Sequence, residues 1–152
     1  MMKSDIEIKD DIYKFIKGSA LEKAVTGKLK KTRRPANSDK EDIVISILDN
    51  GSGQMQEAFV NVNIYVPDDM RDGQAEEKSI RLRELCKIAY NLLEVGRGES
   101  YRFTLDKQRV FEVNGKSEHF INNKLLYKVN AERKSKVDDN TAKMQSIKWL
   151  GV

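Results

Sequence analysis

The residues of this chain with the strongest intrinsic chemistry are its single cysteine, Cys86, and its single histidine, His119. A thiolate beside an imidazole is the minimal activated nucleophile, so one hypothesis is a hydrolase built on this pair. Cys86, however, lies at helical spacing with Leu82, Leu85 and Ala89, on the apolar stripe of a predicted helix. A free cysteine in such a place packs as a small apolar side chain, and no third group to orient the imidazole can be named. We therefore favour a packing role for Cys86.

Two clusters of carboxylates raise the possibility of metal chemistry. They are Asp39, Glu41 and Asp42 before one predicted strand, and Asp68, Asp69 and Asp72 after another. Hard cations prefer carboxylate oxygens, but neither cluster has the spacing of a calcium loop or a nuclease. One cysteine and one histidine also exclude an internal disulfide and a zinc site of the usual four-ligand kind. The sequence predicts that these carboxylates are solvated charges in loops and that the protein holds no metal and no cofactor. A hydrolase that uses these loops is kept as an alternative hypothesis.

A basic run, KLKKTRR, places five cations within residues 28–34: Lys28, Lys30, Lys31, Arg33 and Arg34. Such a run can neutralise phosphates, and the formal charge of +4 with a sequence pI near 9.1 permits contact with nucleic acid. The run lacks the interleaved aromatic residues of a single-strand binder and the helix-turn-helix pattern of a duplex reader. We expect a basic segment that faces solvent or a protein partner, and binding of nucleic acid is the alternative.

The stretch AFVNVNIYV, residues 58–66, has the alternation of a strand with two different faces. Val60, Val62, Ile64 and Val66 form an apolar face that requires a core. The opposite face carries Phe59, Asn61, Asn63 and Tyr65, two amides bracketed by aromatic rings. This composition suits a partly wet contact between subunits, so we expect these four residues to lie in a subunit interface.

The elements that must position these residues follow from periodicity and turn signals. Helical spacing begins at Asp10, and SALE at residues 19–22 has the pattern of a capping box, with Gly27 placed to end the helix. Residues 43–48 and 58–66 read as strands joined by a Gly-rich hairpin turn, and Pro67 ends the second of them.

A second set of elements follows the hairpin. From about residue 74 to 95 the apolar spacing changes to 3.6, which predicts the longest helix, with Asp72 as its cap and Gly96 at its end. GRGES, residues 96–100, follows this helix, whereas a phosphate-binding glycine loop precedes one. Residues 101–105 and 110–113 predict two strands, NGK at residues 114–116 a turn, and residues 120–130 a last strand.

The order of these elements predicts an α+β fold: a mainly antiparallel sheet, with an N-terminal helix and one long amphipathic helix packed on one face. We expect a single domain at residues 10–130, an N-terminal tail at 1–9 and a polar C-terminal tail at 131–152. The C-terminal tail finishes with apolar residues, and we expect Trp149 to dock on this domain or on a neighbour. No apolar run is long enough for a membrane span, and the first residues lack the features of a signal peptide, so we expect a cytoplasmic protein.

With this order of elements, the chain resembles the small tail terminator, or tail completion, proteins of long-tailed bacteriophages. The matching segments are DIYKFIKGSALEKAVTG for the first helix, DIVISIL and AFVNVNIYV for the hairpin, KSIRLRELCKIAYNLLE for the long helix, and RVFEV with NKLLYKVNAE for the closing strands. They cover about residues 10–130. The polar tail after Ala131 and the strength of the basic run depart from the pattern. A phage tail or head protein with a related fold but another position in the virion therefore stays an alternative.

The resemblance implies a non-enzymatic structural protein of a phage or prophage. Proteins of that family form homo-oligomeric rings, commonly hexamers, that join the end of the tail tube to the head connector. The implied partners of this chain are therefore other copies of itself, tail tube protein and connector protein, with DNA contact by the basic run and no membrane. It would be cytoplasmic during assembly and part of the virion afterwards.

Overall fold

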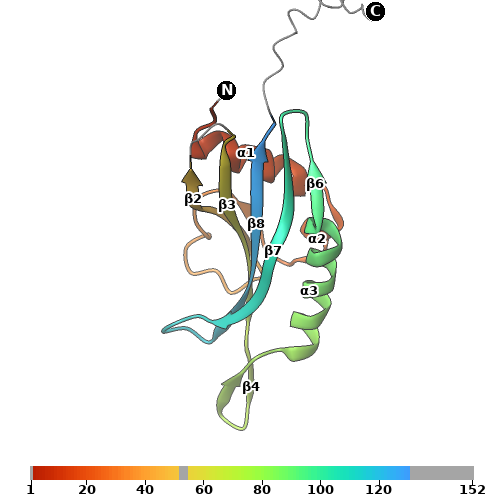
Figure 1. Ribbon diagram of the computed structural model, residues 1–152. Helices are drawn as coiled ribbons and strands as arrows, with labels where there is room; N and C mark the ends of the chain where they lie inside the picture. The colour runs from red at the N-terminus through yellow and green to blue at the C-terminus, as the bar shows by residue number, and fades with distance from the viewer. Residues whose placement is uncertain (1, 52–54, 131–152) are drawn as a thin grey trace, which may run out of the picture.

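The structure, a computed structural model, describes residues 2–51 and 55–130 and has an α+β fold with a curled mixed sheet (Figure 1). Six strands form this sheet in the order β1-β2-β3-β8-β7-β6. The strands are β1 (Leu29–Lys30), β2 (Ile43–Gly51), β3 (Glu57–Pro67), β6 (Val95–Arg97), β7 (Tyr101–Glu112) and β8 (Glu118–Val129). β1 and β2 pair in parallel, and each of the other neighbouring pairs is antiparallel.

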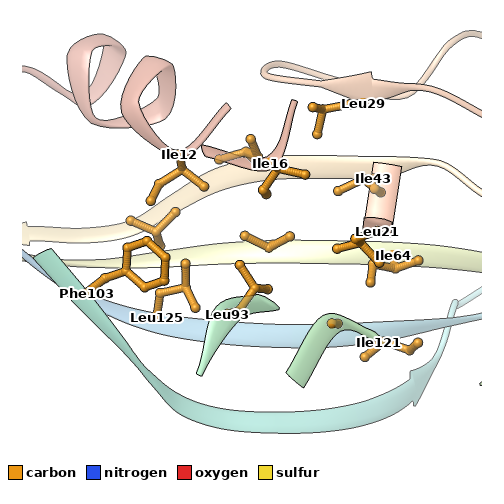
Figure 2. Close-up of a cluster of buried hydrophobic side chains, with 14 of the residues drawn as sticks. Ile12, Ile16, Leu21, Leu29, Ile43, Ile64, Leu93, Phe103, Ile121 and Leu125 are labelled. Atoms are coloured by element: carbon orange, nitrogen blue, oxygen red, sulfur yellow. The ribbon is translucent and has the colours of Figure 1, made fainter. Parts of the chain in front are cut away.

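The helices pack on one face of the sheet and bury its apolar residues. α1 (Asp5–Ile16) passes behind the strands in Figure 1, and α3 (Ser79–Leu93) lies beside β7 and β8. In Figure 2, Ile12 of α1 and Leu93 of α3 lie on the same side of the cluster as Phe103 and Leu125, and Leu21 of α2 lies near Ile64 of β3. The expected apolar face of β3 is confirmed, because Val60, Val62, Ile64 and Val66 are all buried.

α1 begins at Asp5, five residues before the predicted start at Asp10. Ser4 caps it: its hydroxyl accepts a hydrogen bond from the Glu7 amide at 3.2 Å, and the Glu7 carboxylate accepts from the Ser4 amide at 2.8 Å. Ile8 of this first turn is fully buried. Residues 5–9 therefore belong to the packed helix, because the capping box lies at Ser4 rather than at residue 10.

α2 (Ala20–Ala24) has the expected cap but a different second bond. The Ser19 hydroxyl accepts from the Glu22 amide at 3.3 Å, whereas the Glu22 carboxylate accepts from the amide of Gly18 at 2.6 Å. The helix ends at Ala24, earlier than the predicted end at Gly27. Gly27 instead packs against Asp42, where a Cβ atom would lie 2.1 Å from its Oδ1.

α3 is shorter than the predicted helix at residues 74–95. Residues 74–76 form β5 (Gln74–Glu76), which pairs with β4 (Asp69–Arg71) in a hairpin outside the main sheet. Asp72 and Gly73 have positive φ angles of 52° and 77°, the combination of a type I′ turn, so Asp72 is a turn residue and not a helix cap. The sequence does not distinguish this hairpin from the first turns of a helix, because Asp, Glu and Gln residues are common in turns as well as at the start of a helix.

Gly96 is not the cap of α3, as predicted, but a residue of β6 opposite Phe103. A Cβ atom at this position would lie 2.3 Å from the Phe103 ring, so only glycine allows the ring to pack on this strand.

The strands after Gly96 differ from the prediction in number. Residues 101–112 form one strand, β7, and not two, because a register shift between Leu105 and Lys107 reverses its alternation while the pairing with β8 continues. The predicted turn at residues 114–116 is confirmed, with Gly115 at a φ of 76°.

Candidate contact surface on the open face of the sheet

The face of the sheet opposite the helices carries mainly polar, aromatic and cationic side chains that are partly exposed, with Val44 and Leu126 as aliphatic members, of which Val44 is buried. We call it the open face. Its members are Val44, Ser46 and Asp49 of β2, Phe59, Asn61, Asn63 and Tyr65 of β3, Phe120, Asn122, Lys124, Leu126 and Lys128 of β8, and Arg102, Thr104, Lys107, Arg109 and Phe111 of β7. Strand alternation and the ladder register place them together, because residues opposite one another point to the same side.

Three asparagines form the centre of the open face. The Asn122 amide nitrogen donates to Asn61 Oδ1 at 3.0 Å and to Asn63 Oδ1 at 2.7 Å. The pair on β3 was expected from the sequence, and Asn122 joins it from β8. One amide thus holds the other two in fixed orientations, and Asn61 Nδ2, Asn63 Nδ2 and Asn122 Oδ1 form no side-chain hydrogen bond with the described residues.

Aromatic rings form a row at one end of this amide cluster. Tyr65 and Phe120 stack with their centroids 5.4 Å apart, and Phe120 and Phe111 lie 5.5 Å apart. Guanidinium groups terminate the row, with Arg34 at 4.5 Å from the Tyr65 centroid and Arg109 at 5.1 Å from that of Phe111. Phe111 is 38% exposed, so the row keeps apolar area available to a partner.

Phe59, at the other end of the amide cluster, is covered by a cation. Lys124 Nζ lies 4.3 Å from the Phe59 ring centroid and 3.8 Å from the Asp106 carboxylate. Lys128 similarly lies 3.6 Å from Glu57. Lys107 and Arg109 form no ion pair with any residue in the described part of the chain. The open face therefore has a positive balance that favours an acidic or polyanionic contact.

The structure divides the basic run into two groups. Arg34 lies inside the protein: its guanidinium contacts Asp42 at 3.1 Å and Glu118 at 2.7 Å, and its side chain is 14% exposed. Lys31 pairs with Asp10 at 2.7 Å. Arg34 therefore supports the fold and is not available to a partner, whereas the Lys31 pair lies at the surface, with the Lys31 side chain 42% exposed. Lys28 and Arg33 are exposed and Lys30 is half-buried, and none of the three forms an ion pair with another described residue.

Asp42 is the buried centre of the Arg34 network. Burial by itself would raise the pKa of this carboxyl, but it accepts hydrogen bonds from the Ser38 hydroxyl, from the Lys28 amide at 2.8 Å and from Arg34. Together these bonds outweigh the desolvation and hold its pKa below the ordinary value. Asp42 is therefore a charged structural residue, and its position does not offer free ligand oxygens to a cation.

The other acidic residues of the predicted clusters are also used internally or dispersed. Glu41 binds Arg81, whose Nη2 donates at 2.8 Å, and Asp69 faces Lys78 at 4.0 Å. Asp39 is exposed, and Asp72 lies in the β4–β5 turn. Within residues 2–51 and 55–130, no group of three Asp, Glu, His or Cys residues is arranged to hold a metal ion.

Cys86 and His119 do not form a dyad. His119 Nδ1 lies 2.7 Å from Asp68 Oδ1, and its ring lines a cavity of about 840 Å³ between the β4–β5 hairpin and α3. Cys86 packs against the core, and its backbone carbonyl accepts a hydrogen bond from Gln108. Burial raises the pKa of the Cys86 thiol, which disfavours the thiolate that a nucleophile requires.

Sequence reasoning missed several residues of the open face: Phe111, Arg109, Phe120, Asn122 and Lys124. On β8 the signal was present, because Phe120, Asn122 and Lys124 alternate with the buried Ile121 and Leu125. On β7 the register shift between Leu105 and Lys107 interrupts the alternation, so the sequence pattern does not show which residues lie on the open face.

Trp149 lies outside the described residues. None of the helices in the described part of the chain has the length and apolar character needed to cross a bilayer. No known protein family and no curated protein matches this chain in sequence.

Proposed function

We propose that this chain is a non-enzymatic structural protein that self-associates into a ring, in the manner that its resemblance to tail terminator proteins implies. The observation that carries this proposal is the open face: the helices cover only the opposite side of the sheet, while this side presents fixed amides and an exposed aromatic row. Such a mixture of aromatic area and oriented polar groups is typical of protein contacts that retain some water. The order of helix, hairpin, amphipathic helix and closing strands also agrees with the resemblance.

In this proposal the mechanism is geometric. Copies of the chain contact one another through surfaces that include Phe59, Asn61, Asn63 and Tyr65, and the ring presents one side to tail tube protein and the other to the head connector. The protein would assemble in the cytoplasm and remain in the virion. A hydrolase is disfavoured because His119 pairs with Asp68 and not with Cys86, and because the thiol is partly buried, which raises its pKa.

The test is the molar mass of the full chain by light scattering over a concentration series at low and high salt. We expect a discrete oligomer in the wild-type chain and a folded monomer when Asn61 and Asn63 are both replaced by Asp. Aspartate keeps the oxygens that accept from Asn122, so the circular dichroism spectrum should not change. Desolvating the new charges in a contact is unfavourable, so the oligomer should dissociate.

Asn91→Asp supplies the matched control, because Asn91 is exposed on α3 and the chemical change is the same. It should leave the oligomer intact. An oligomer that persists in the Asn61/Asn63 variant would move the contact to another surface, and a wild-type chain that stays monomeric at millimolar concentration would contradict the ring.

A second candidate function is contact with nucleic acid. The observation in its favour is that cations and aromatic rings occur together on the open face, the combination that the basic run lacks. Lys28, Lys30 and Arg33 would add phosphate contacts. Titration of a single-stranded oligonucleotide at several salt concentrations tests it: replacing these three residues by Gln should reduce the affinity and flatten the salt dependence, whereas absence of binding by the wild-type chain would exclude it.

A further inference from the structure

Two stretches of sheet edge have a strand neighbour on one side only. The register of β1 with β2 ends at Val44, and that of β6 with β7 ends at Thr104. Residues 46–51 of β2 and residues 106–112 of β7 therefore have no outer partner strand within the part of the chain that the structure describes. Each stretch is the C-terminal half of its strand. Because β2 and β7 run in opposite directions, the two free stretches lie at opposite ends of the sheet as well as at opposite edges (Figure 1).

The backbone groups point outward at alternate residues in residues 107–112 of β7 and in residues 49–51 of β2, whereas the register shift between Ile47 and Asp49 interrupts the alternation earlier in β2. On β7 the amide of Val113 donates to Glu118 of β8, so the residues that share its parity, such as Arg109, also bond toward β8. Gln108 and Val110 consequently direct their amides and carbonyls away from the sheet. On β3 the amide of Tyr65 donates to Asp42, so Phe59, which shares the parity of Tyr65, bonds toward β2, where its partner is Asp49. Asp49 therefore bonds inward, and Asn50 directs its backbone groups outward.

We infer that one copy of this chain pairs with the next through these edges, residues 46–51 of one copy lying antiparallel to residues 106–112 of the other. The inference rests on the proposed self-association and names where the contact lies. From β2 through β3 and β8 to β7 each step is antiparallel, so β2 and β7 have opposite directions. A copy related by rotation about an axis inclined to the strands, as the axis of a barrel is, therefore presents β7 antiparallel to the β2 of its neighbour.

The side-chain parity and charge of the two stretches agree with this pairing. Asp49 and Arg109 both lie on the open face and both bond inward, so they can lie opposite each other while Asn50 and Gln108 exchange the backbone hydrogen bonds. Lys107, two residues before Arg109 on β7, lies on the same face. Pairing of two β7 edges would instead oppose cations, so the charges favour β2 against β7.

A contact between two different edges is heterologous, and repetition of it produces a ring if the rotation closes. The free stretches lie at opposite ends of the sheet, so successive copies are staggered along the strand direction. Tilting the strands relative to the ring axis accommodates such a stagger, as in closed barrels. In this ring the copies meet at their edges and their open faces form one continuous surface, so Asn61 and Asn63 of β3 lie beside each junction, with β2 between them and the neighbouring copy.

A charge swap in the full chain tests the inference. Arg109→Asp opposes two carboxylates across the junction, and Asp49→Lys opposes two cations, so each should raise the midpoint concentration of assembly about tenfold. The double variant restores the attraction and should assemble close to the wild-type midpoint. Both residues are exposed, and Arg83→Asp on α3, also exposed, is the control for charge change alone. Light scattering gives the midpoints, and amide hydrogen exchange at Gln108 and Val110 should be slower in the assembled protein than in the Arg109→Asp variant.

The outcomes separate this inference from the proposed function. Recovery of assembly in the double variant supports edge pairing, and if the Asn61/Asn63 variant then also stays assembled, the contact lies at the edges and the open face is not part of it. Unchanged assembly in both single variants, with dissociation of the Asn61/Asn63 variant, overturns edge pairing and leaves the ring proposal standing. Fast exchange at Gln108 and Val110 in a discrete wild-type oligomer also overturns edge pairing. A wild-type chain that is monomeric at millimolar concentration overturns both, and slow exchange at these amides in that monomer would assign the edge to another segment of the same chain.

Discussion

Asn122 and Asn123 are neighbours on β8 that serve opposite faces of the sheet. Asn123 is fully buried beneath the helices, where it donates to the Val62 carbonyl at 3.1 Å and accepts from Gln108 at 2.7 Å. Asn122 lies on the open face and donates to Asn61 and Asn63. The first amide is enclosed and its bonds serve the fold, whereas the second belongs to a cluster that still has donors and acceptors to offer.

The same difference extends over the two faces of the sheet. The covered face is mostly aliphatic, and its burial supplies the main stabilising free energy. The open face contributes aromatic stacking and cation–π contacts, which are weaker and are partly solvated. Successive side chains of a strand thus alternate between residues that stabilise the fold and residues that are available to a partner.

The largest effect should come from a substitution on the covered face. Leu125→Ala removes a fully buried side chain and leaves a cavity, so we expect the free energy of unfolding to fall by about 4 kcal/mol. The control is Leu126→Ala, the same change one residue later on the open face, which should cost less than about 1 kcal/mol. Urea denaturation measures both, and similar costs would contradict the assignment of the two faces.

Arg34 lies over Tyr65 at the end of the open face, but its ion pairs with Asp42 and Glu118 are expected to stabilise the fold. Arg34→Met keeps much of the side-chain volume but leaves the buried carboxylates of Asp42 and Glu118 without their cation, and we expect a loss of about 3 kcal/mol in urea denaturation. Arg33→Met, one residue earlier and exposed, should change the free energy of unfolding by less than about 0.5 kcal/mol. Equal effects would show that the basic run is uniformly solvated.

A smaller effect should appear in the pH dependence of stability. The folded-state pKa of Asp42 lies below its ordinary value of 3.8, so its charged form stabilises the folded state above that pH, and this contribution is lost as the pH falls through the folded-state pKa. We therefore expect Asp42→Asn to be less stable than the wild-type chain at neutral pH, with the difference narrowing below about pH 4.

Thermal unfolding over a pH series measures that difference, with the exposed Asp39→Asn as the control variant. A difference independent of pH would show that the loss of stability comes from packing and not from charge.

Part of the fold was predictable because it depends on local patterns. The alternation of residues 58–66 identified both faces of β3, and NGK identified the β7–β8 turn. The start of α1 was missed although its capping box, Ser4 with Glu7, is visible in the sequence. The β4–β5 hairpin was missed because its turn, Asp72 with Gly73, was interpreted as the start of a helix.

The candidate contact surface was predicted only on the strand where alternation is uninterrupted. On β7 a single extra residue at the register shift moves Lys107 and Arg109 onto the open face, and a pattern with a period of two does not reveal such an insertion. The role of Arg34 was also beyond the sequence, because its carboxylate partner Glu118 is 84 residues away along the chain.

By itself, the sequence determined which side of β3 is apolar, which residues form its uncovered side and where the closing turn lies, since each depends on neighbouring residues and backbone preferences. Tertiary structure alone decided which cations of the basic run remain available, which amides meet, and which stretches of β2 and β7 lack a partner strand. Those outcomes depend on ladder register and on contacts between distant segments, and the free energy of such contacts is defined only when the whole chain has folded.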